Sequence, residues 1–283
     1  MPPSFVSFLS DYGNADEFVG VCKAVIVGLA PETTIVDVTH EIPVHDVRAG
    51  GLALVRAIQY LPAGIVLAVV DPGVGTDRRA IAVQTDSGVL IGPDNGLLAP
   101  AVAMIGGASR AVSLTNTEYW LESPGPTFAG RDVMAPAAGY LAAGVDLSDL
   151  GDEIDPVSLT PGLVSLPQAA DGAIVGEVWW VDRFGNCQLN VDPTELGAAG
   201  VAQGATVEVR VGDDEKSARM ARWVHTYADG NPGELLLLVD SYGLMAIACD
   251  KRSAAEELGV KAGQAVTLAF NPTSRPIKVA GSK

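Results

Sequence analysis

Residues 66–83 read VLAVVDPGVGTDRRAIAV, an apolar run followed by a polar turn and a second apolar run. Apolar runs of this length between turn residues are typical of strands that a sheet buries on both faces. Asp71 therefore stands at the end of a buried strand, and Arg78 and Arg79 follow it across a Pro-Gly-Val-Gly turn. A turn requires neither residue type. The spacing fits an ion pair that braces the turn, and equally a carboxylate–guanidinium pair that holds water at a cavity edge.

Strand and helix patterns alternate on both sides of this stretch. Strands are predicted at residues 4–10, 33–40, 64–71, 80–85 and 88–94. Helices are predicted at residues 15–31, 45–62 and 131–144, where apolar residues recur at intervals of three and four. Asp16 and Glu17 are expected in the first turn of the first helix. The predicted fold class of this N-terminal domain is α/β, with a mostly parallel sheet covered on both faces.

The pattern changes after this domain. Residues 150–172 carry three prolines and no clear periodicity, so we predict a domain over 1–155, a linker over 156–172 and a second domain over 173–283. Short strands at regular spacing, typical of a small all-β C-terminal barrel or a sandwich, are predicted at residues 173–182, 187–191, 205–212, 234–243, 244–250 and 264–270.

Composition excludes several classes of protein. The net charge is −16, from 34 acidic against 18 basic residues, and the sequence has no basic run. We therefore expect neither nucleic acid nor a membrane surface as a partner. The three cysteines show no CxxC spacing, which argues against a disulfide framework or a zinc site. The N-terminus has no basic segment of the kind that begins a signal peptide, and no apolar run approaches the ~20 residues of a membrane span, so a cytoplasmic location is expected.

Polar clusters follow four of the predicted strands. They read SDYGNADE at 10–17, THEIPVHD at 39–46, DPGVGTDRR at 71–79 and GPDNG at 92–96. Ligands of open α/β sheets bind beyond the carboxyl ends of the strands, so these clusters predict a small-molecule site, although each is also an ordinary turn sequence.

Familiar catalytic motifs are missing from the sequence. It contains no GxSxG, no GxxxxGK[ST] and no complete GxGxxG opening a helix. The three histidines, His40, His45 and His225, show no HExxH spacing, although the first two lie near Asp46. No metal site is predicted.

Seven segments, in matching order, closely resemble the S-adenosyl-L-methionine (SAM) hydroxide adenosyltransferases, also called adenosine-forming SAM hydrolases. This family is related to the SAM-dependent fluorinase and chlorinase. The resemblance runs nearly from end to end and is carried by residues 8–26, 35–50, 69–83, 92–98, 127–144, 181–190 and 239–248.

The resemblance implies a fold and a reaction. It implies an α/β N-terminal domain, a C-terminal β-barrel, and a homotrimer whose active sites lie between the N-terminal domain of one subunit and the C-terminal domain of the next. Water or hydroxide attacks C5′ of the SAM ribose, and the products are adenosine and L-methionine. SAM is the substrate, and no cofactor or metal is implied.

The same resemblance implies roles for four residues of the N-terminal domain. Asp71 and Arg78, within DPGVGTDRR, match the catalytic aspartate and arginine. Asp11, within FLSDYG, matches the aspartate that binds the ribose hydroxyls. Phe128, within TFAGRD, matches a residue beside the reacting carbon.

Five residues of the C-terminal domain match contributions of the adjoining subunit. Asp182, Phe184 and Asn186 lie within VDRFGN, where the Asp and Asn are expected to hold the methionine ammonium and adenine-side groups. Tyr227 is expected to stack on adenine, and Ser241, within VDSYG, to contact the methionine carboxylate.

One residue departs from the family pattern. The hydrolases usually read Phe-His-Gly-Arg-Asp where this chain has Phe-Ala-Gly-Arg-Asp, so Ala129 occupies the position of the third catalytic residue. Loss of a group that transfers or orients a proton typically lowers the rate about 10²–10⁴-fold. The hypothesis is that SAM binding survives and hydrolysis is slow.

Two alternatives remain open at this point. The first is a SAM-dependent halogenase that makes 5′-halo-5′-deoxyadenosine. The related halogenases carry an aromatic residue at the Asp71 position and lack the pair with Arg78, so these two residues favour water over halide. The second is a non-catalytic protein that binds SAM or adenosine, an alternative that Ala129 keeps open.

Overall fold

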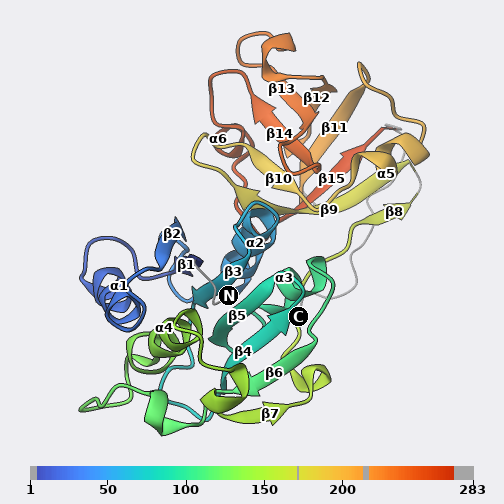
Figure 1. Ribbon diagram of the computed structural model, residues 1–283. Helices are drawn as coiled ribbons and strands as arrows, with labels where there is room; N and C mark the ends of the chain where they lie inside the picture. The colour runs from blue at the N-terminus through green and yellow to red at the C-terminus, as the bar shows by residue number, and fades with distance from the viewer. Residues whose placement is uncertain (1–4, 171, 213–216, 271–283) are drawn as a thin grey trace. The chain divides into compact units, whose positions relative to one another are not determined.

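A twisted sheet organises the N-terminal part of the chain (Figure 1). The computed structural model describes residues 5–170, 172–212 and 217–270, and the chain divides into two compact units, residues 1–164 and 165–283. Within the described part of the first unit, seven strands lie in the order β2-β1-β3-β5-β4-β6-β7. Their bounds are β1 Phe5–Ser10, β2 Thr34–Thr39, β3 Gly64–Val69, β4 Ala80–Thr85, β5 Gly88–Pro93, β6 Arg110–Ser113 and β7 Asp152–Ile154.

The predicted, mostly parallel sheet is confirmed, but β4 and β7 run antiparallel to their neighbours. The pairs β1–β2, β1–β3 and β3–β5 are parallel, whereas β4 is antiparallel to both β5 and β6. The reason is local, because only Asp86 and Ser87 separate β4 from β5 and so short a connection forces a hairpin. Strands β6 and β7, which the sequence analysis did not predict, extend the same edge of the sheet.

Helices pack against the sheet and bury its apolar strands. They are α1 Phe18–Leu29, α2 Val47–Ile58, α3 Ala99–Met104 and α4 Ala135–Ala142, the last preceded by a π-helical turn over Gly130–Met134. Alternate residues of β1 and β3, such as Phe8 and Leu67, form one buried cluster with α1 and α4. The expectation that Asp16 and Glu17 lie in the first turn of α1 was wrong. Glu17 is the N-cap residue, so both acidic residues precede the first turn.

The second unit is a closed barrel, as predicted. Among the described residues, seven strands close in the order β9-β10-β14-β13-β12-β11-β15 and back to β9. Adjacent strands are antiparallel except β12 and β13, which are parallel. The bounds are β9 Ala173–Val181, β10 Cys187–Leu189, β11 Thr206–Val211, β12 Arg219–Trp223, β13 Leu235–Val239, β14 Met245–Cys249 and β15 Ala265–Ala269, with short helices α5 Pro193–Ala198 and α6 Ala254–Leu258.

The segment expected as a linker, 156–172, contains structure of its own. A 3₁₀ turn over Pro156–Ser158 is followed by an extended stretch and by β8, Gln168–Ala170, which pairs with β9 outside the closed barrel. The Thr160 backbone N–H donates to the Asp94 carboxylate, so the first half of this segment is fixed to the N-terminal unit. None of the helices in the described residues has the length and apolar composition needed to cross a membrane.

Candidate active site

A cavity of about 770 Å³ opens at the carboxyl ends of three neighbouring strands. Asp11 and Tyr12 enter its lining from the end of β1, His45 from the loop after β2, and Asp71 from the end of β3. A segment that precedes α4 closes another side with Phe128, Ala129 and their neighbours. Three of the four polar clusters seen in the sequence therefore contribute to one site, as expected for an open α/β sheet.

The fourth cluster, GPDNG, has a different role. Asp94 accepts hydrogen bonds from Nε and Nη2 of Arg79 at 2.8 and 2.5 Å. Asn95 donates from its side-chain amide to the backbone carbonyl of Val70 at 2.9 Å. This cluster braces the ends of β3 and β5 and is not part of the described lining of the 770 Å³ cavity.

Asp71 and Arg78 form a bidentate ion pair beside the cavity. Nε of Arg78 donates to Oδ1 of Asp71 at 2.7 Å, and Nη2 donates to Oδ2. The side chains are 6% and 14% exposed, so water screens the pair weakly. Asp71 lines the 770 Å³ cavity, whereas Arg78 lines a neighbouring cavity of about 620 Å³. The guanidinium thus fixes the orientation of a carboxylate that faces the larger cavity.

The turn between these residues explains why the chain can pair them. Val74 N–H donates to the Asp71 carbonyl at 3.2 Å, and Thr76 closes a second turn on the Gly73 carbonyl through its backbone and hydroxyl. Gly75 has a φ of +79°, which a residue with a side chain rarely adopts. Two consecutive turns reverse the chain within seven residues and return Arg78 to Asp71.

Asp11 is held by the loop that follows β2. Its Oδ2 accepts the backbone N–H of His45 at 2.9 Å, and its own N–H donates to the Val69 carbonyl at 3.3 Å. His45 has a φ of +66°, a conformation that costs energy for a residue other than glycine and concentrates at functional sites. The strained backbone directs this N–H toward the carboxylate. The sequence carries no signal for this contact.

Tyr12 is a cavity residue that the sequence analysis missed. Its ring packs edge-on against Phe18 and Phe128, with centroids 5.8 and 5.6 Å away. Burial, followed by the nearby Cys22, Asp11 and Asp71 groups, raises the pKa of Tyr12 well above its ordinary value. The phenol is therefore neutral across the physiological range, and the site combines an aromatic wall with two carboxylates.

The Phe128–Asp132 segment is shaped by the π-helical turn. Arg131 lies 5.0 Å from the centre of the Phe128 ring and pairs with the neighbouring Asp132 at 2.5 Å. A Cβ atom on Gly130 would lie 2.0 Å from the Tyr12 hydroxyl, so glycine is needed for this close approach. Ala129 lines both the 770 Å³ and the 620 Å³ cavities and presents only a methyl group to each. π-Helical turns occur frequently at functional sites.

The barrel residues singled out in the sequence lie in three of its connecting loops, β9–β10, β12–β13 and β13–β14. Asp182 accepts the backbone N–H groups of Phe184 and Asn186, both at 2.9 Å, and the Asn186 side-chain amide at 2.8 Å. Phe184 is 78% exposed. Burial, followed by the charges of Asp182 and Asp240, raises the pKa of Tyr227 above its ordinary value.

Ser241 lies next to Asp240 in the exposed turn between β13 and β14. The structure therefore places the five barrel candidates on neighbouring loops of one unit. In the described residues, no three His, Cys, Asp or Glu side chains are grouped so that they could hold a metal ion.

These features define a class of protein: a two-unit chain, α/β sheet followed by β-barrel, with a small-molecule cavity at the strand ends of the sheet. Residues 6–151 match the N-terminal domain of the SAM hydroxide adenosyltransferase family, and residues 176–267 match its C-terminal domain. The chain belongs to this family.

Relatives and solved structures agree with that assignment. The (R)-S-adenosyl-L-methionine hydrolase of Salinispora tropica is 44% identical over 262 residues, covering 93% of this chain and 96% of that protein. The enzyme of the same name from Thermus thermophilus is 38% identical over 93% of this chain and 98% of its own length. A fluorinase from an Actinoplanes species is 28% identical over 93% and 96%. An uncharacterised conserved protein from Thermotoga maritima has a similar structure, with a TM-score of 0.86 at 34% identity over 93% of this chain and 99% of that one.

Proposed function

We propose that this protein hydrolyses SAM to adenosine and L-methionine by attack of water at C5′ of the ribose. The observation that carries the proposal is the buried carboxylate of Asp71, which Arg78 fixes by two hydrogen bonds and which faces a 770 Å³ cavity. The names of the relatives from Salinispora tropica and Thermus thermophilus support the same reaction.

The main task of the protein in this reaction is to orient the attacking water toward C5′. The water oxygen forms a bond to C5′, the C5′–S bond breaks, and its electron pair neutralises the sulfonium to give the thioether of methionine. Positive sulfur already activates the leaving group, so the step needs no Lewis acid. Asp71 accepts a hydrogen bond from the attacking water and holds it in line with the C5′–S bond, and the water proton passes to solvent after attack. Fixed orientation of this kind contributes much of the rate of such displacements.

Substrate binding completes the proposal. Asp11 binds the ribose hydroxyls, and Phe128 packs beside the reacting carbon, both from the described lining of the cavity. Asp182, Phe184, Asn186, Tyr227 and Ser241 belong to the barrel of a neighbouring subunit in a homotrimer and contact the methionine and adenine groups. The exposed ring of Phe184 supports a role in contacts outside its own unit.

Ala129 sets the speed of the reaction in this proposal. A methyl group can neither orient the water nor take a proton from it, so hydrolysis is slow and binding is retained. Ala129→His is expected to raise kcat about 10²–10⁴-fold with little change in KM. An Ala129→Leu variant, which adds bulk but no group that can orient water or take a proton, serves as a control for the effect of size. Equal rates for the unmodified protein and the His variant would show that position 129 does not limit the rate.

A halogenase remains the second candidate because fluorinases are among the relatives. The carboxylate of Asp71 faces the cavity and disfavours a halide there by charge repulsion. The test is to incubate the protein with SAM in halide-free buffer, and then with added chloride or fluoride, and to separate the nucleosides chromatographically. Adenosine and methionine in equal amounts support hydrolysis. A 5′-halo-nucleoside supports a halogenase, and unchanged SAM with measurable binding supports a non-catalytic protein.

A further inference from the structure

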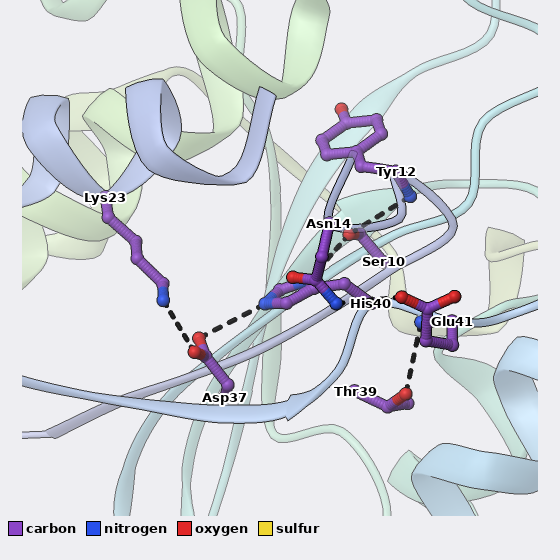
Figure 2. Close-up of polar contacts among 8 residues, drawn as sticks. All are labelled: Ser10, Tyr12, Asn14, Lys23, Asp37, Thr39, His40 and Glu41. Carbon is purple, nitrogen blue, oxygen red and sulfur yellow. Dashed lines mark hydrogen bonds and ion pairs between the residues drawn. The ribbon is translucent and has the colours of Figure 1, made fainter. Parts of the chain in front are cut away.

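A chain of polar contacts runs from the protein surface to the turn that carries Asp11 (Figure 2). Lys23 Nζ lies 2.6 Å from Oδ2 of Asp37, and Oδ1 of Asp37 lies 3.1 Å from Nε2 of His40. Nδ1 of His40 lies 2.8 Å from the Ser10 hydroxyl. The proposed reaction uses none of these four side chains.

An irregularity in the sheet creates the contact between Asp37 and His40. Residues three apart on a regular strand point to opposite faces. The register of β2 against β1 shifts here, so that Phe8 pairs with Asp37 but Leu9 pairs with Thr39. The extra residue turns the end of β2 and brings the two side chains together. The Phe8 ring then packs edge-on against the imidazole at 4.7 Å, which fixes its plane.

The partners of each polar atom indicate which atoms of Asp37, His40 and Ser10 donate a hydrogen bond and which accept one. Burial opposes ionisation of Asp37, but the hydrogen bonds from Lys23 and His40, together with the charge of Lys23, outweigh it and lower the pKa of this carboxyl. An ionised carboxylate only accepts, so Nε2 of His40 carries the proton that it donates to Asp37. In the neutral imidazole with this tautomer, Nδ1 is then the acceptor for the Ser10 hydroxyl. The Ser10 oxygen in turn accepts the backbone N–H of Tyr12 at 3.3 Å, so every contact has a donor and an acceptor.

His40 also contacts the turn that carries Asp11 through its backbone. Its backbone carbonyl accepts the N–H of Gly13 at 2.8 Å. The turn from Ser10 to Gly13 is therefore held to His40 through both the side chain and the backbone, and Asp11 and Tyr12 project from it into the cavity lining.

The contacts Ser10–His40–Asp37 follow the order of a hydrolase triad, but the burial of Ser10 excludes a role as nucleophile. Ser10 is fully buried and His40 is 4% exposed, and neither is in the described lining of the cavity. A nucleophilic serine must reach its substrate. The chain of contacts instead reaches the surface at Asp37 and Lys23, whose side chains are 46% and 32% exposed, so it connects the surface to the turn.

We propose that His40 is a positioning residue, which holds the Ser10–Gly13 turn through the Ser10 hydroxyl so that the Asp11 carboxylate meets the ribose hydroxyls of the substrate. This inference rests on the proposed function, because it needs Asp11 to bind ribose. A buried imidazole with both nitrogens hydrogen-bonded adds a rigid contact to the backbone hydrogen bonds of the turn.

The test compares the binding of adenosine with that of 2′,3′-dideoxyadenosine, which lacks the ribose hydroxyls, by calorimetry on the full-length protein. The unmodified protein is expected to prefer adenosine about tenfold to hundredfold, as for hydrogen bonds to a charged group. Asp11→Asn removes most of this preference. His40→Phe keeps a ring but removes both nitrogens, and it is expected to lose the preference while binding dideoxyadenosine unchanged. His40→Asn, whose amide reaches the place of Nδ1, is expected to restore most of it.

Two further variants keep the test decisive. Ser10→Ala breaks the link without changing His40 and is expected to behave as His40→Phe does, should that variant fold poorly. Thr85→Val removes another buried hydroxyl, bonded to the Gly88 carbonyl in the β4–β5 hairpin, and is expected to leave the preference unchanged. A preference that survives in both His40→Phe and Ser10→Ala overturns the positioning role alone. An equal loss of affinity for adenosine and for 2′,3′-dideoxyadenosine indicates that His40 has a merely structural role. An unmodified protein without any preference overturns the role of Asp11 and the positioning role together.

Discussion

Replacement of Asp71 by asparagine separates orientation of the water from the shape of the cavity. The amide matches the carboxylate in size but carries no charge and accepts at only one atom, so one of the two hydrogen bonds from Arg78 is lost. We expect kcat for methionine release to fall about 10²–10⁴-fold. That corresponds to about 3–5 kcal/mol of activation free energy. KM for SAM is expected to change little, because the residue acts on the water.

The same substitution has a cost in stability that must be separated from the rate. The pair is nearly buried, and breaking such a pair typically costs about 3–5 kcal/mol, with the retained amide oxygen placing this variant near the lower end. Asp94→Asn is the matched control, because Asp94 is 4% exposed and pairs with the adjacent Arg79. It is expected to lose similar stability in urea unfolding while retaining its rate.

The assay measures methionine and adenosine at saturating SAM, at a temperature where both variants are folded by circular dichroism. A rate that falls equally in the Asp71 and Asp94 variants would refute the reasoning, because loss of rigidity would then explain both. A rate for Asp71→Asn within a factor of three of the unmodified protein would refute it as well.

Three other predictions concern the fold around the site. Gly130→Ala should lower the free energy of unfolding by about 1–3 kcal/mol, and with it the midpoint of thermal unfolding, because its Cβ would overlap the Tyr12 hydroxyl. Gly20→Ala should raise the midpoint, because Gly20 is an exposed position of helix α1 with nothing within 4 Å of an added Cβ. A decrease in both variants would contradict this. The hydrogen bond from the Arg222 guanidinium lowers the pKa of Glu234 from 4.5 to about 2. The difference in unfolding free energy between the unmodified protein and Glu234→Gln should therefore be full above pH 4.5 and should shrink as the pH falls toward 2. A difference that is constant over this range in urea titrations would count against the ion pair. Burial raises the pKa of Cys22 to about 12, and the other two thiols are buried as well, so a thiol reagent at pH 8 should label the protein only after unfolding; rapid labelling of the native state would contradict this.

Much of the sheet and its loops could be predicted because local pattern and burial agree there. A continuous apolar run followed by Asp71 identifies a central strand and its carboxyl end without tertiary information. Helix α1 is visible from its spacing, but its start was predicted too early, because Asp16 and Glu17 lie before the first turn. Boundaries depend on capping contacts, which a pattern does not contain.

The partners of Arg78 and Arg79 could not be assigned from spacing. Adjacent residues of extended chain point in opposite directions, so two consecutive arginines must take different partners, but which one returns to Asp71 depends on the turn. The contribution of His45 was equally hidden, because it acts through a backbone N–H in a strained conformation.

Strand β12 was missed for a different reason. Arg219–Trp223 has two arginines among five residues, and Ala221 is its fully buried member. Its parallel pairing with β13 depends on a connection that passes over residues 224–234, and no local signal specifies such a pairing.

The most direct test of the central claim is to follow the oxygen atom. The reaction is run in water enriched in ¹⁸O, and both products are analysed by mass spectrometry. Attack of a water held by Asp71 on C5′ predicts adenosine with one ¹⁸O atom at the 5′ position, unlabelled methionine, and loss of both products in Asp71→Asn. Unlabelled adenosine, or 5′-methylthioadenosine as the main nucleoside, would show that water does not attack C5′ and would contradict the mechanism.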